Sequence, residues 1–207
     1  MRRRWMLSAV VMLVAALAPR GGATAQEPRL AARLSAPARA GVEAVLDSAR
    51  REGLPLEPLV DRALEGASKR ADDGRIIAAV QRLAGDLGAA RDALGSGVSD
   101  AEITAGASAL RAGARPGDLA RIRTRRSGQS VTVAVAVLTD LVALGVPADT
   151  ATLAVLALAQ SDDAAYLAFR RSVERDVALG ATPVAALTYR LAGELTNVGA
   201  DSRPRKP

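Results

Sequence analysis

The sequence contains no cysteine and no histidine, and only four of its 207 residues are aromatic. A Ser-His-Asp triad, a cysteine nucleophile, a histidine general base and a thiolate metal site are therefore all excluded. Disulfide bonds and the lipid-modified cysteine of a lipoprotein are excluded for the same reason. Because so few aromatic side chains could stack on bases and no long basic stripe exists, we predict that the protein binds no nucleic acid.

The residues that are abundant favour helices. The chain is 49% hydrophobic and 24% charged, which is typical of a globular protein rather than a disordered one. Alanine, leucine and valine make up most of the apolar total, and alanine and leucine are the strongest helix formers. We therefore expect an all-α protein, and its length favours one domain.

Residues 1–25 have the three parts of a secretory signal peptide. Arg2–Arg4 is positively charged, Met6–Ala18 is an uncharged apolar run of 13 residues, and Ala23-Thr24-Ala25 has the small-x-small cleavage pattern. The apolar run is shorter than the about 20 residues that a membrane-spanning helix needs. We predict cleavage after Ala25, a periplasmic or secreted protein, and no transmembrane span in the mature chain; the alternative is an uncleaved anchor.

Removal of this leader changes the charge balance. The chain loses four arginines, which leaves 24 basic and 22 acidic residues and a net charge of +2. Three of the remaining basic residues lie between Arg203 and Lys206. We expect residues 26–35 to form a flexible lead-in, residues 36–199 a single helical domain, and residues 200–207 a disordered basic tail.

Glycine followed two or three residues later by proline or serine recurs along the chain. Glycine just past a helix end adopts the left-handed conformation easily, and proline is tolerated in the first turn of the next helix. Such short connections place consecutive helices side by side. We therefore predict an array of about eight or nine helices in hairpins with Gly-x-Pro turns, with positive φ angles at Gly53, Gly145 and Gly180.

The hydrophobic periodicity between these turns is helical, with one ambiguous segment. Apolar stripes with helical spacing follow Asp72 and Asp162, and Ser99-Asp100-Ala101-Glu102 matches a capping box. In residues 131–138, valines alternate with small residues as in a strand. The pattern continues without a break into leucines that end at Gly145, so we favour a buried helix over a strand and expect residues 131–160 to form the most buried hairpin.

Part of the sequence is repeated. Residues 44–55 resemble residues 136–147 at an offset of 92, and Asp72-Asp73 is matched by Asp162-Asp163 at an offset of 90. Two repeated three-helix units, residues 40–97 and 131–199, would explain this pattern. The alternative is that alanine-rich helices with Gly and Pro turns resemble one another by composition.

The stretches Gly53–Val60 and Ala63–Lys69 resemble uncharacterised secreted helical proteins of high-GC bacteria. The matching residues belong to turns and helix caps. The resemblance implies a location in the cell envelope, and it transfers no known active site to this chain.

Paired carboxylates could do acid–base work if one of them had a raised pKa. Asp72/Asp73 and Asp162/Asp163 could act as the pair of a carboxylate-based hydrolase, but we favour capping because each pair begins a helix. Glu57/Asp61 and Glu65/Lys69 are spaced four apart, as on a solvated helix surface. No acidic loop has the spacing of a calcium site. We predict no catalytic residue, no metal and no cofactor.

One basic cluster is the only candidate site. Arg121, Arg123, Arg125 and Arg126 could bind a phosphate, an anionic lipid headgroup or an acidic partner. Alternatively, they form a solvated helix end, where cations complement the helix dipole before Ser127-Gly128. We favour the solvated helix end.

These patterns together favour an exported interaction or scaffold protein of the cell envelope, without catalysis. We expect its partner to be another envelope protein, with at most weak contact to an anionic surface. The alternative is a periplasmic carrier that holds a small apolar molecule between loosely packed helices.

Overall fold

The structure, a computed structural model, describes residues 28–201, with side chains described through Gly193. The described residues form ten α-helices and no strand, so the all-α prediction is confirmed. The helices are α1 (Pro28–Ala31), α2 (Ala36–Arg51), α3 (Glu57–Ser68), α4 (Asp73–Leu94), α5 (Asp100–Ala112), α6 (Pro116–Arg125), α7 (Thr132–Ala143), α8 (Ala148–Ala157), α9 (Asp163–Ala178) and α10 (Pro183–Asp201). None of them is long and apolar enough to cross a membrane.

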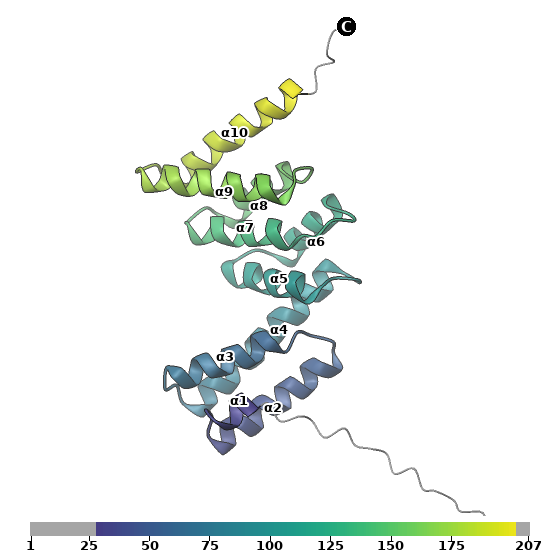
Figure 1. Cartoon of the computed structure of the whole chain (residues 1–207), viewed down its shortest axis with the longest axis vertical. Helices are drawn as coiled ribbons and strands as arrows, with labels where there is room; N and C mark the ends of the chain where they lie inside the picture. The colour runs from purple at the N-terminus through teal and green to yellow at the C-terminus, as the bar shows by residue number, and fades with distance from the viewer. Residues whose placement is uncertain (1–27, 202–207) are drawn as a thin grey trace, which may run out of the picture.

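The helices stack into an elongated array (Figure 1). In one row α5 packs on α7 and α7 on α9, and in a second row α4 packs on α6, α6 on α8 and α8 on α10. Helices two positions apart in the chain therefore lie side by side, which is how α-solenoids stack their hairpins. At the N-terminal end α2 and α3 both pack against α4.

Close packing at this end depends on two glycines. A Cβ atom at Gly41 of α2 would overlap the side chain of Ile77, and one at Gly66 of α3 would lie 2.9 Å from Cγ1 of Ile76. The two neighbouring isoleucines of α4 therefore fit into gaps on two different helices. The core is built from small and branched side chains that approach closely, as the composition suggests.

The turns have the predicted left-handed glycines. Gly53, Gly145 and Gly180 have φ angles of 68°, 100° and 104°. At the end of α7, the amide of Gly145 donates to Val142 and the amide of Val146 donates to Leu141, at 2.9 and 3.1 Å. This pair of bonds is the Schellman motif, which satisfies the last carbonyls of a helix.

The same motif recurs along the chain. The two hydrogen bonds recur at the helix ends marked by Gly53, Gly113 and Gly180, as well as at Gly145. The last three of these turns lie 32 and 35 residues apart and belong to the successive hairpins α5–α6, α7–α8 and α9–α10. Hairpins thus repeat from α5 to α10, and the two three-helix units of residues 40–97 and 131–199 stay a prediction.

Neighbouring turns of these hairpins are in contact along one edge of the stack. Arg115, at the α5–α6 turn, forms an ion pair with Asp149 at the start of α8. A Cβ atom at Gly145 would lie 3.7 Å from Pro183 in the α9–α10 turn. The turns at Gly113, Gly145 and Gly180 therefore lie next to one another along this edge.

The ambiguous segment is a helix. Thr132–Ala143 is α7, with Val131 at its N-cap position. Val131, Ala134, Val135 and Leu138 are fully buried, while Ala136 is exposed. A strand would place Ala134 and Leu138 on the opposite face from the valines, so the burial follows the helical period and excludes the alternation.

The expectations for the two chain ends are only partly tested. The segment expected to be a flexible lead-in contains α1, and Leu30 is fully buried because α1 packs on α2 and α3. We correct that expectation for residues 28–35. At the other end α10 continues to Asp201. The predicted signal peptide, residues 1–25, and residues 202–207 of the predicted tail lie outside the described residues.

Candidate functional site

The basic cluster that the sequence singled out lies at the end of α6 and is divided between interior and surface. Arg126 is only 3% exposed and Arg123 is half-buried, whereas Arg121 and Arg125 are exposed. The cluster is therefore not one solvated helix end, and its members have different roles.

Arg126 connects three segments of the chain. Its Nε donates to the Ser130 carbonyl at 3.1 Å, its Nη1 to the Ser161 carbonyl at 2.8 Å, and its Nη2 to Asp163 at 2.9 Å. Its guanidinium carbon lies 4.9 Å from the centre of the Tyr166 ring, in range of a cation–π interaction. Arg126 thus joins the α6–α7 loop to the beginning of α9, and for this residue the prediction of a solvated helix end was wrong.

Arg123 belongs to a second buried connection, centred on Glu102. The Glu102 carboxylate accepts hydrogen bonds from the amide of Ser99 and from the amide of Val131, both at 2.9 Å, and from Arg123 at 3.3 Å. Burial by itself would raise the pKa of Glu102, but these hydrogen bonds and the charge of Arg123 outweigh it and lower the pKa. The predicted capping box of Ser99 and Glu102 is confirmed, and its carboxylate also holds the start of α7.

Only two arginines of the cluster remain available to a ligand. Arg121 lies 3.6 Å from Asp118, and its side chain is 53% exposed. Arg125, in the last turn of α6, is exposed as predicted for a helix end. An anionic ligand would meet these two residues and not the four that the sequence suggested.

The paired carboxylates act as caps. Asp72 accepts a hydrogen bond from the amide of Arg75 at 2.9 Å, and Asp162 accepts one from the amide of Ala165 at 2.8 Å. Their neighbours are also engaged: Asp73 accepts from Ser35 at 2.7 Å, and Asp163 from Arg126. The capping interpretation of Asp72 and Asp162 is confirmed.

The surface carboxylates form ion pairs. Glu65 pairs with Lys69, one turn later, and Glu57 with Arg29 of α1 at 2.8 Å. A hydrogen bond from Arg29 lowers the pKa of Glu57, and one from Lys69 lowers the pKa of Glu65. Among the described residues, no three carboxylates are grouped so that they could hold a metal ion.

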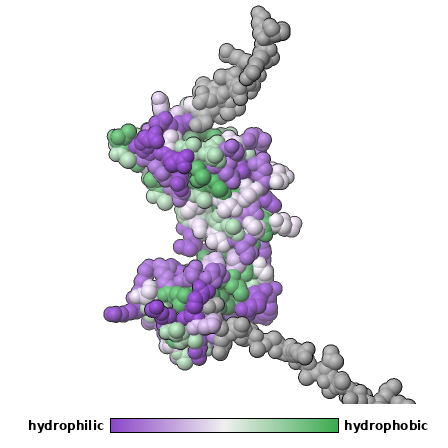
Figure 2. All heavy atoms as spheres, in the orientation of Figure 1, coloured by the Kyte–Doolittle hydropathy of each residue, from purple (hydrophilic) through white to green (hydrophobic). Residues whose placement is uncertain are grey.

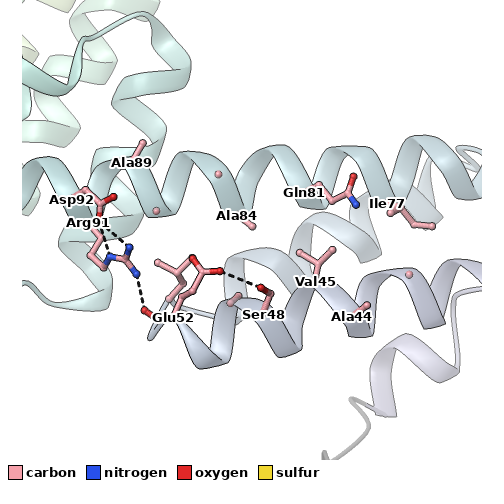
Figure 3. Close-up of a pocket in the computed structure, with 15 residues that line it drawn as sticks. Ala44, Val45, Ser48, Glu52, Ile77, Gln81, Ala84, Ala89, Arg91 and Asp92 are labelled. Carbon is pink, nitrogen blue, oxygen red and sulfur yellow. Dashed lines mark hydrogen bonds and ion pairs between the residues drawn. The ribbon is translucent and has the colours of Figure 1, made fainter.

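A groove of about 770 Å³ between α2 and α4 is a second candidate (Figure 3). Only α2, the turn that follows it and α4 supply its lining. Because just two helices and a turn bound it, an occupant would be held between two walls and would stay accessible along its length.

Small side chains line most of this groove. Ala44 lies on the α2 side, and Ala84, Gly85 and Gly88 lie on the α4 side. A Cβ atom at Gly85 or at Gly88 would meet no atom within 4 Å, so the space beside both glycines is empty. The backbone of α4 is therefore open to contact over about one helical turn.

One end of the groove is polar. Arg91 donates to Asp92 at 2.8 Å and to the carbonyl of Glu52 at 2.7 Å (Figure 3). The second of these hydrogen bonds caps the C-terminal end of α2. Ser48 donates to the Glu52 carboxylate at 3.1 Å. Glu52 has no cationic partner among the described residues, so it gives this end a negative charge.

Sequence analysis missed this groove. The signal that could have revealed it is the pair of glycines in the interior of a long helix, since each glycine costs about 1 kcal/mol relative to alanine there. Gly85 and Gly88 are not at turns, and unlike Gly41 and Gly66 they do not make room for a neighbouring helix.

No protein-family model matches the chain, and neither a curated protein nor a solved structure matches it significantly. Its function is therefore inferred from its own residues.

Proposed function

We propose that the protein is an exported, non-catalytic interaction or scaffold protein of the cell envelope, and that its α2–α4 groove binds a helix of a partner protein. The observation that carries this proposal is the empty space beside Gly85 and Gly88. A helix laid in a groove gains affinity from close apolar contact along its length, and glycines permit the closest approach.

The charge in the groove indicates the chemistry of the partner. Arg91 and Asp92 pair with each other, so Glu52 supplies the one unbalanced charge of the described lining. A partner helix with an apolar side and a lysine or arginine at the end that meets Glu52 fits this arrangement, since like charges at that position would repel.

The surroundings of the carboxylates support the absence of catalysis. The pKa values of Glu57, Glu65, Glu102 and Asp176 are all lowered, so these groups stay ionised at neutral pH. A general acid needs a carboxyl whose pKa is raised towards neutrality. Of the carboxylates that the sequence offered as hydrolase candidates, Asp72 and Asp162 cap helices, Asp163 pairs with Arg126, and Asp73 accepts a hydrogen bond from Ser35.

Export is proposed from the leader in residues 1–25. Cleavage after Ala25 would make Gln26 the first residue of the mature protein, and intact-mass analysis of the exported protein tests this. A mass that retains Met1 would contradict it.

The groove is tested by blocking it inside the cell. A photo-cross-linking residue at Ala44 should capture a partner protein, and Gly88→Leu should abolish the capture because the leucine side chain would occupy the groove at a position where a Cβ atom meets no other atom within 4 Å. Gly117→Leu is the matched control, since a Cβ atom at Gly117 also meets open space but lies outside the groove. Capture that persists in Gly88→Leu would disprove the groove as the binding site.

A carrier of a small apolar molecule is the second candidate function. The volume of the groove falls in the range of small-molecule sites, about 300–1,000 Å³, and its walls are largely apolar. Native mass spectrometry of the purified protein distinguishes the two. If the protein is a carrier, the wild type should retain a small molecule and Gly88→Leu should not. If it is a scaffold, neither should retain a small molecule, and Gly88→Leu should still abolish capture of the protein partner.

A further inference from the structure

The C-terminal end of the stack has an apolar helix face that no other described helix covers. Between Pro183 and Leu191, the exposed residues of α10 are Val184, Ala185, Thr188 and Tyr189. None of them is charged. Tyr189 is 72% exposed, whereas the other two aromatic residues with described side chains, Tyr166 and Phe169, are buried in the core. Hydrophobic residues lie beside strongly hydrophilic ones at this end of the molecule (Figure 2).

The only charged residue in this part of α10 is turned towards α9. Arg190 donates from Nε and Nη2 to the two carboxylate oxygens of Asp176, at 2.7 and 2.6 Å. Its guanidinium carbon lies 5.6 Å from the centre of the Tyr189 ring. The bidentate pair therefore directs the Arg190 charge towards α9, and the Tyr189 ring lies beside this pair.

The stacking pattern indicates what shape of partner fits there. Along each row, a helix is covered by the helix two positions later: α7 by α9 and α8 by α10. No described helix follows α10. In stacked repeats, an outer face that meets water is normally polar. The uncharged face of α10 departs from that rule, and one more helix packed on it would cover its apolar residues.

The free charges beside this face are positive. Arg171 and Arg175 are exposed on α9, and neither forms an ion pair with a described residue. The carboxyl of Asp176 has a lowered pKa, first through its hydrogen bond from Arg190 and also through the charge of Arg175. Arg175 therefore lies close to the edge where α9 meets α10.

We propose that this α9–α10 end binds an amphipathic helix of another protein that carries acidic residues beside its apolar stripe. Tyr189 would be the central apolar contact, because exposed tyrosines beside arginines dominate the binding energy of many interfaces. Arg171 and Arg175 would pair with the acidic residues. A second copy of this chain fits less well, since two such faces would bring the exposed arginines of both copies together and Asp176 is already paired with Arg190.

The test uses the mature protein and two helical peptides of equal length. Both peptides carry leucines at the same positions of one helix face; one has glutamate and the other lysine at the flanking positions. By fluorescence anisotropy, the glutamate peptide should bind more tightly, and the preference should shrink as salt screens the arginines. Tyr189→Ser should weaken binding by roughly tenfold or more, while Tyr189→Phe should retain it.

Charge reversal makes the test specific. Arg175→Glu should shift the preference towards the lysine peptide, and Arg82→Glu on the exposed surface of α4 should leave it unchanged. Three results would overturn the proposal: equal or absent binding of the two peptides, Tyr189-dependent dimers in sedimentation, or binding to phosphatidylglycerol vesicles with the same dependence on Tyr189. Gly88→Leu should have no effect here, so failure at this end is separable from failure of the α2–α4 groove.

Discussion

Replacement of Arg126 by glutamine should destabilise the protein far more than the same replacement of its neighbour Arg125. Arg126 is 3% exposed and makes three hydrogen bonds, two of them to the carbonyls of Ser130 and Ser161. Hydrogen bonds that involve a charged group contribute about 1.5–3 kcal/mol each. Since glutamine can replace some of them, we expect a net loss of about 3 kcal/mol in the free energy of unfolding. For a chain of this size, that lowers Tm by roughly 6–12 °C.

Equilibrium urea denaturation followed by circular dichroism measures this difference. Arg125→Gln changes the same residue type on an exposed site and should stay within about 0.5 kcal/mol of the wild type. Asp163→Asn separates the ion pair from the carbonyl contacts; because the Asp163 side chain is 48% exposed, we expect it to cost only about 0.5–1 kcal/mol. Equal stabilities of Arg126→Gln and Arg125→Gln would refute the assignment of Arg126 to the interior.

Three further substitutions have outcomes that depend on local geometry. Gly145→Ala should cost about 1 kcal/mol in urea denaturation, because φ is 100° there and a Cβ atom is disfavoured in the left-handed region; a neutral effect would contradict this. Gly85→Ala should stabilise by about 1 kcal/mol, since the added methyl meets open space in a helix. Gly106→Ala should instead destabilise by about 1–2 kcal/mol, because its Cβ would lie 2.9 Å from that of Ala90; equal effects at both sites would refute the packing. Acid should destabilise the protein, because the pKa of Glu102 is lower in the folded than in the unfolded chain, and the unfolded chain therefore binds more protons. The contribution of Glu102 to the free energy of unfolding is fully present above about pH 4.3. It is lost as the pH falls through the pKa of Glu102 in the folded protein. Glu102→Gln should therefore flatten the dependence of Tm on pH below about pH 4.3, and an unchanged slope would contradict the assignment.

Most local features of the fold could be predicted because they depend on neighbours in the sequence. The Ser99–Glu102 capping box, the caps at Asp72 and Asp162, and the left-handed glycines each involve residues at most a few positions apart. Helical spacing also identified α7 despite its alternating valines. Such features follow from backbone hydrogen bonding and side-chain period, which a single sequence displays directly.

The roles of the arginines could not be predicted in the same way. Arg125 and Arg126 are adjacent and chemically identical, yet one is exposed and the other buried. What distinguishes them is Asp163, together with the carbonyl of Ser161, and both lie more than 30 positions away in sequence. Only the stacking of α7 on α9, with α6 packed on α7 and α8, brings these groups together. The α2–α4 groove has the same origin, since its two walls come from different helices.

Stacking also predicts how stability is distributed along the chain. In a stack each helix is stabilised mainly by its neighbours. Among the described helices, α7 packs on α5 on one side and on α9 on the other, whereas the main neighbours of α10 are α8 and α9. Amides of residues 186–190 should therefore exchange with deuterium faster than those of residues 135–139, where the side chains of Val135, Val137 and Leu138 are fully buried. Uniform protection would mean instead that the array opens as one cooperative unit. If the α9–α10 end binds an acidic helix as proposed, the glutamate peptide should slow exchange in residues 186–190 and leave α2 unaffected, because the bound helix would give α10 the outer neighbour that every preceding hairpin already has.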